Sequence, residues 1–92
     1  MEANMSLYQQ IDVWKRLGSG RLCRYRCLRL EPEGTYVVQS ADFLSVPLDM
    51  AVVKMLDTQF HELLGEEAPE ERSQTYTTLE EAVAAHDREF EN

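Results

Sequence analysis

The sequence predicts an α+β fold, in which a small antiparallel β-hairpin or sheet is packed by about three helices. Three stretches of the chain carry apolar residues at helical spacing. Between the first two lie the extended runs "RLCRYRCLRL" and "TYVVQSADFL", joined by the turn sequence "EPEG". Because 92 residues suffice for one modest core, we expect residues 1–92 to form a single small globular domain.

The first predicted helix covers residues 7–17. Ser6 and Gln9 have the spacing of a capping box, and Gly18 follows as a C-terminal stop. The apolar residues of this segment recur at spacings of three and four: Leu7, Ile11, Trp14 and Leu17. The sequence "GSG" at 18–20 then forms a flexible turn into the first extended run.

The hairpin is the best-specified element, because both its turn and its register can be predicted. Pro32 suits a type I turn, and Gly34 suits the left-handed position of a bulge. This turn sets four pairs on one face: Leu30–Tyr36, Leu28–Val38, Arg26–Ser40 and Arg24–Asp42. On the other face we expect a buried core toward the open end of the hairpin, formed by Cys23, Tyr25, Ala41 and Phe43. Arg24 and Arg26 then point away from that core.

Two helices are predicted after the hairpin. Asp49 is a plausible N-cap of a central helix that ends near Gly65 and covers the hairpin. Its apolar face consists of Val52, Val53, Leu56, Phe60, Leu63 and Leu64. An acidic loop over 66–74 and a short extended piece precede the final helix, where Thr78 and Glu81 have capping-box spacing. Leu79, Val83 and Phe90 give this helix a thin apolar stripe.

Charge is distributed unevenly along a chain whose formal net charge is -8. Positions 15–29 hold six basic residues and no acid, whereas eleven acids and two arginines follow from position 57 onward. The arginines of the hairpin could pair with the protein's own acids, contact a protein partner, or contact nucleic acid. The opposite charges of Arg24 and Asp42 favour internal pairing for at least some of them. The candidate partner-binding residues are Arg21, Arg26, Arg29 and Tyr36.

No catalytic, cofactor-binding or metal-ligating residues are predicted, and we do not expect an enzyme. His61 and His86 have no ligand at zinc-binding spacing, and no glycine-rich phosphate loop is present. Cys23 and Cys27 lie four positions apart on one predicted strand, too far apart for a disulfide. We therefore expect two free, buried thiols and no cofactor.

The predicted function is that of a small, acidic, non-enzymatic protein-interaction or accessory domain, able to associate with itself. The alternative is a nucleic-acid-associated protein that uses the arginine-rich hairpin. A protein partner or a second copy of the chain is favoured over nucleic acid, because the rear half of the chain opposes a positive field. The sequence has no apolar run of membrane-spanning length and no secretory signal, so a cytoplasmic location without membrane contact is expected.

Overall fold

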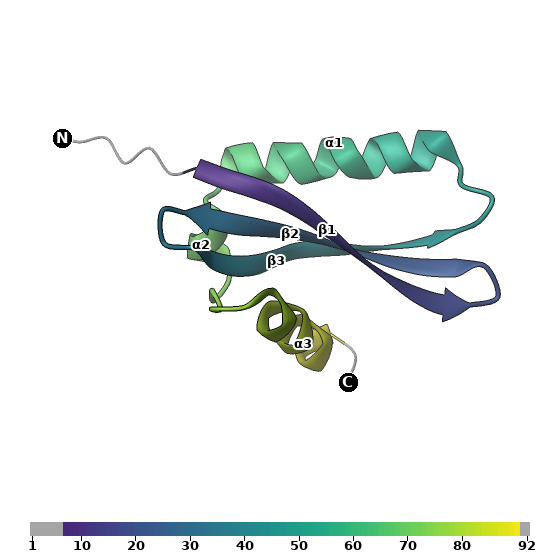
Figure 1. Ribbon diagram of the computed structural model, residues 1–92. Coiled ribbons are helices and arrows are strands. Elements are labelled where there is room, and N and C mark those ends of the chain that lie inside the picture. The colour runs from purple at the N-terminus through teal and green to yellow at the C-terminus, as the bar shows by residue number, and fades with distance from the viewer. Residues whose placement is uncertain (1–6, 91–92) are drawn as a thin grey trace.

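The computed structural model describes residues 7–90 and has an α+β architecture, as predicted. A three-stranded antiparallel sheet, in the order β1-β2-β3, is formed by β1 (Leu7–Gly18), β2 (Arg21–Glu31) and β3 (Thr35–Ser45). Three helices follow: α1 (Met50–Glu66), α2 (Pro69–Arg72) and α3 (Leu79–Phe90). Figure 1 shows α1 along one face of the sheet and α3 across the opposite face. The sheet is therefore the middle layer of three.

The prediction of a helix over residues 7–17 is wrong, because this segment forms strand β1. It pairs with β2 from Leu7 to Gly18. Every second side chain faces the same side of the sheet, so Ile11 and Val13 both pack against the buried cluster on one face. The "GSG" sequence closes this hairpin with three consecutive residues at positive φ, which glycine allows most readily. Pairing along the whole of β2 outweighs the local helical spacing. The expected cap residue, Ser6, lies outside the described residues.

The predicted register of β2 and β3 is confirmed at the open end of the hairpin and wrong near its turn. Arg24 pairs with Asp42, as expected. A bulge then inserts Gln39, so Leu28 pairs with Val37 instead of Val38. The same shift pairs Leu30 with Thr35 and Arg29 with Tyr36. Because a shift of one residue reverses the faces of a strand, Tyr36 and Val38 lie on the α3 side of the sheet.

Apolar residues are buried on both faces of the sheet. On the α1 face the cluster consists of Leu28, Leu30, Val37 and Phe60, with Tyr8 and Leu64 packed against it. On the α3 face it consists of Cys23, Tyr25, Cys27, Val38 and Ala82. The expected burial of Cys23 and Tyr25 is confirmed. The expected burial of Phe43 is wrong, since this side chain is 68% exposed.

The helix ends follow the sequence signals closely. The side chain of Asp49 accepts a hydrogen bond from the Ala51 N–H at 3.0 Å, which confirms the N-cap of α1. The Glu81 N–H donates to Thr78 Oγ1 at 3.1 Å at the start of α3. The acidic loop contains the short helix α2, which the sequence did not predict; Pro69 opens it, a position where the missing N–H has no cost.

Candidate functional site

The two arginines in the middle of β2 are buried between the sheet and α1. The side chains of Arg24 and Arg26 are 7% and 2% exposed. Both contact Asp42 of β3: Arg24 donates from Nη2 to Oδ2 at 2.8 Å, and Arg26 donates from Nη1 to the same oxygen at 3.3 Å. Opposite charges on neighbouring strands thus neutralise each other inside the fold, as the sequence indicated for Arg24.

Two more carboxylates complete this buried charge cluster. Asp57 of α1 lies 3.0 Å from Arg26 Nη1 and 3.4 Å from Arg24 Nη2. Asp12 of β1 lies 3.4 Å from Arg26 Nε. Phe60 covers the same guanidinium, whose central carbon lies 4.4 Å from the ring centroid. The cluster therefore joins all three strands to α1.

The four predicted partner-binding residues do not form one surface. Arg26 is buried in the charge cluster, and Arg21 is exposed beside the β1–β2 turn. Arg29 and Tyr36 do lie together, with the guanidinium carbon 5.9 Å from the ring centroid, and Arg29 Nε also lies 3.1 Å from a Glu31 carboxylate oxygen. Internal pairing is confirmed for Arg24, Arg26 and Arg29. Partner binding through Arg21, Arg29 and Tyr36 stays a prediction.

Strand β3 has an open edge, which Tyr76 occupies at one end. The Tyr36 N–H donates to the Tyr76 carbonyl at 2.7 Å, and the Tyr76 N–H donates back to the Tyr36 carbonyl at 2.8 Å. The chain thus already adds an antiparallel residue to this edge. At the other end, the Val46 N–H bonds inward to the Gly20 carbonyl. Along an antiparallel edge strand, successive residues direct their backbone N–H and C=O groups alternately toward and away from the neighbouring strand. Because the Val46 N–H points inward, Ala41 and Phe43 direct these groups away from the sheet.

The two edges of the sheet differ in charge. The outer strand β1 carries Asp12, Lys15 and Arg16, and charged side chains at an edge oppose pairing with other chains. Strand β3 carries only Asp42, which is buried against Arg24. Over residues 40–45, β3 is the edge strand of the sheet, so among residues 7–90 no strand pairs with its outward backbone groups, and it carries no free charge there.

A groove of about 710 Å³ runs beside this edge on the α3 face. Ala41, Ala82 and Ala85 contribute small side chains to its lining, which leaves it open. Phe43 and Phe90 also line it, and both are 68% exposed. Polar and charged residues complete the lining, among them Gln39, Arg72, His86 and Glu89. An open strand edge beside such a mixed groove is an arrangement that can bind an extended polypeptide segment.

Sequence reasoning missed the groove and its two phenylalanines. The sequence pattern places Phe43 on the buried face of the hairpin and Phe90 in the apolar stripe of the last helix. Val83 and Phe90 are seven residues apart, which places them on the same helical face, so the spacing gives no sign that Phe90 is exposed. The fold brings Phe43 and Phe90 to the same groove from distant parts of the sequence, and no local pattern shows this.

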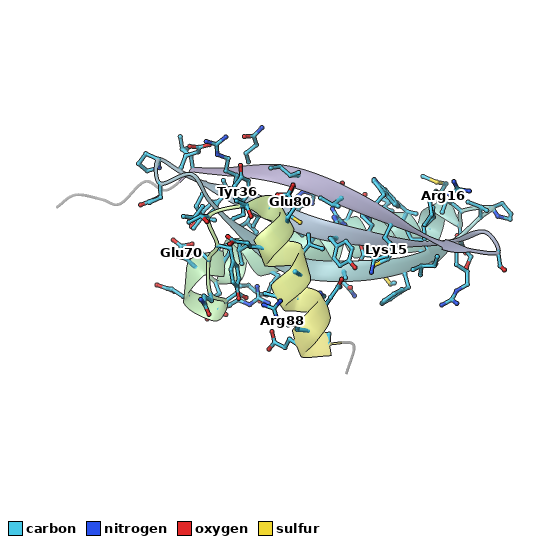
Figure 2. All side chains as sticks on the ribbon, turned by 60° about the horizontal axis from the view of Figure 1, so that its bottom comes forward. Lys15, Arg16, Tyr36, Glu70, Glu80 and Arg88 are labelled. Carbon is cyan, nitrogen blue, oxygen red and sulfur yellow. The ribbon has the colours of Figure 1, made fainter. Side chains whose placement is uncertain are left out.

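A second polar cluster lies between β1, β2 and α3. The Tyr25 hydroxyl donates to Asp87 Oδ1 at 2.7 Å, and Lys15 Nζ lies 3.4 Å from Asp87 Oδ2. Figure 2 labels Lys15 on the sheet. Burial raises the pKa of Tyr25 to about 12, and the bond to Asp87 acts in the same direction. The pKa of Lys15 is raised chiefly by its hydrogen bond with Tyr25. The contacts of Tyr25 and Lys15 with Asp87 thus tie α3 to the sheet.

Within residues 7–90, no group of three or more His, Cys, Asp and Glu side chains is arranged to hold a metal ion. No helix in the same part of the chain has the length and apolar character needed to cross a membrane. Comparison with protein-family models, with curated proteins and with solved structures found no match to this chain. The fold and the surface are thus the basis for the functional proposal.

Proposed function

We propose that this chain is a non-enzymatic protein-interaction domain, and that it binds an extended polypeptide segment along the open edge of β3. The occupant's chemistry follows from the site. Its backbone must bond to Ala41 and Phe43, and its alternate side chains must be apolar to enter the groove beside them. A free acidic side chain on the bound segment is disfavoured by the net charge of -8, whereas the groove lining itself carries one basic and one acidic residue, Arg72 and Glu89.

The observation that carries the proposal is the bridge between Tyr36 and Tyr76. These residues exchange two backbone hydrogen bonds at the same edge, in the same antiparallel sense that a bound segment would use. The edge beyond them, over residues 40–45, faces no other strand of the described sheet, and its one charged residue, Asp42, is paired with Arg24. The alternative, contact with nucleic acid, has weaker support, because Arg24 and Arg26 are buried and paired with acids.

The test is selection from a displayed library of random peptides on three forms of the protein. Ala41→Pro removes an outward N–H from the β3 edge, which the native fold tolerates because that N–H has no partner in the sheet. Gln10→Pro is the matched control, since its N–H points outward from the β1 edge by the same alternation. We expect peptides with alternating apolar residues to be enriched on the wild type and on Gln10→Pro, but not on Ala41→Pro. Equal enrichment on all three forms would refute the proposal.

A further inference from the structure

We infer that the segment bound at the β3 edge is the β3 edge of a second copy of this chain. This inference rests on the proposed function and adds the identity of the partner. Two copies related by a twofold axis would join their sheets edge to edge into one six-stranded sheet. Each groove would then be completed by a side chain from the other copy.

The positions of the outward residues make the edge complementary to itself. The register centred on Asp42 uses the outward groups of both copies, and it places Ala41 opposite the partner's Phe43 and Phe43 opposite the partner's Ala41. The large side chain of Phe43 thus lies beside the small one of Ala41, and the twofold symmetry repeats this contact once. The partner's Phe43 would then lie beside the groove, whose lining includes the small side chains of Ala41, Ala82 and Ala85.

Charge also favours a second copy at this edge. Two chains of net charge -8 repel each other at most relative orientations. Contact along residues 40–45 brings no free carboxylate of β3 toward the partner, because Asp42 is held by Arg24 and Arg26. Acidic residues concentrate instead toward α2, and Figure 2 shows Glu70 of α2 at the end of the sheet opposite Arg16. The neutral edge is where like-charged copies can approach.

The extent of pairing is limited on both sides. Tyr76 and the bulge at Gln39 end the open edge before residue 40, and Pro47, which has no N–H to donate, follows Val46. A contact of six residues with one groove per copy belongs to the class of weak, reversible interfaces. We therefore expect a reversible monomer–dimer equilibrium in which dimer is detectable at protein concentrations below about 1 mM.

Sedimentation velocity over a series of concentrations tests this inference. The wild type should shift from monomer toward dimer, and Phe43→Lys should weaken association by about thirtyfold or more, as loss of a central aromatic anchor does. Met50→Lys is the matched control, because Met50 is 66% exposed but lies outside the edge and the groove. This variant should dimerise like the wild type.

A charge-pair experiment makes the result specific to the contact between copies. Phe43→Lys and Phe43→Glu should each be monomeric. A mixture of the two should form heterodimers, because the two position-43 side chains are diagonal neighbours across the twofold axis, within reach of long side chains of opposite charge. Folding of each variant is checked by circular dichroism, and Phe90→Lys, also at a 68% exposed position, provides a second probe of the groove. A wild type that stays monomeric to about 1 mM, or a dimer that survives these substitutions, would overturn the inference. Peptide capture at Ala41 would still stand in that case, so the two proposals fail separately.

Discussion

Asp57 of α1 lies 3.0 Å from Arg26 of β2, measured from Oδ1 to Nη1, and this ion pair connects the long helix to the middle of the sheet. The guanidinium is buried, whereas the Asp57 side chain is 41% exposed. Asp42, which contacts the same guanidinium, is 8% exposed. The two carboxylates therefore differ in the free energy that each contributes.

We expect Asp42→Ala to lower the free energy of unfolding by about 3 kcal/mol, because it deprives two buried guanidinium groups of the buried carboxylate that they share. Asp57→Ala should lower it by about 1 kcal/mol or less, since water screens a partly exposed pair. Urea denaturation followed by circular dichroism measures both values. Equal losses for the two variants would show that Asp42 is not the principal partner of the arginines.

The raised pKa of Tyr25 predicts a loss of stability at alkaline pH. The phenol has a pKa of about 12 in the folded protein and its ordinary value of about 10 when unfolded. The folded state thus binds this proton more tightly, and the stability present below about pH 10 is lost as the pH rises toward about 12. Lys15 acts with the same sign, because its pKa is also raised.

Ultraviolet absorbance titration of the phenols checks this prediction. Tyr25 should ionise late, and Tyr25→Phe should remove that late step. Tyr36→Phe is the control, which should leave the late step in place. If Tyr25→Phe left the late titration unchanged, the assignment to the bond with Asp87 and to burial would be contradicted.

The two cysteines should be unreactive in the folded protein. Both are buried thiols outside any disulfide, and burial raises the pKa of Cys27 to about 12, which suppresses the reactive thiolate. A thiol reagent such as Ellman's reagent should modify neither residue at neutral pH until the protein is unfolded in urea. Rapid modification of a thiol in the native state would contradict the burial of this face of β2.

Two glycine substitutions should change stability in opposite directions. Gly20 has φ +72°, and an added Cβ would lie 3.1 Å from Val46 Cγ2, so Gly20→Ala should destabilise the fold by about 1 kcal/mol or more. Gly65 lies in α1 with open space around its Cα, so Gly65→Ala should stabilise the fold by about 0.5 kcal/mol. Thermal unfolding gives both shifts. Stabilisation by Gly20→Ala would argue against the β1–β2 turn.

Features that depend on nearby residues were predicted correctly from the sequence, and features that depend on pairing between distant segments were not. The caps at Asp49 and Thr78 depend on nearby residues and were predicted from them. Strand β1 was predicted as a helix, because Leu7 and Ile11 fit helical spacing as well as alternation, and only pairing with β2 decides between them. The bulge at Gln39 has no local signature, so the faces of Tyr36 and Val38 could not be predicted.

The candidate site was predictable only in part. Internal pairing of Arg24 with Asp42 follows from the hairpin register alone, and it is confirmed. The contact of Arg26 with Asp57 depends on where α1 crosses the sheet, which the sequence does not specify. The groove at Phe43 depends on the packing of α3 and on the path of the chain through α2.

Amide hydrogen exchange measured by NMR at low and high protein concentration tests the interaction edge most directly. The N–H groups of Ala41 and Phe43 face outward, so they should exchange rapidly in dilute solution and become protected as a second copy pairs with the edge. The N–H groups of Gln10 and Asp12, which face outward from β1, should exchange rapidly at every concentration. Exchange at Ala41 and Phe43 that does not change with concentration would contradict pairing of the β3 edge with a second copy.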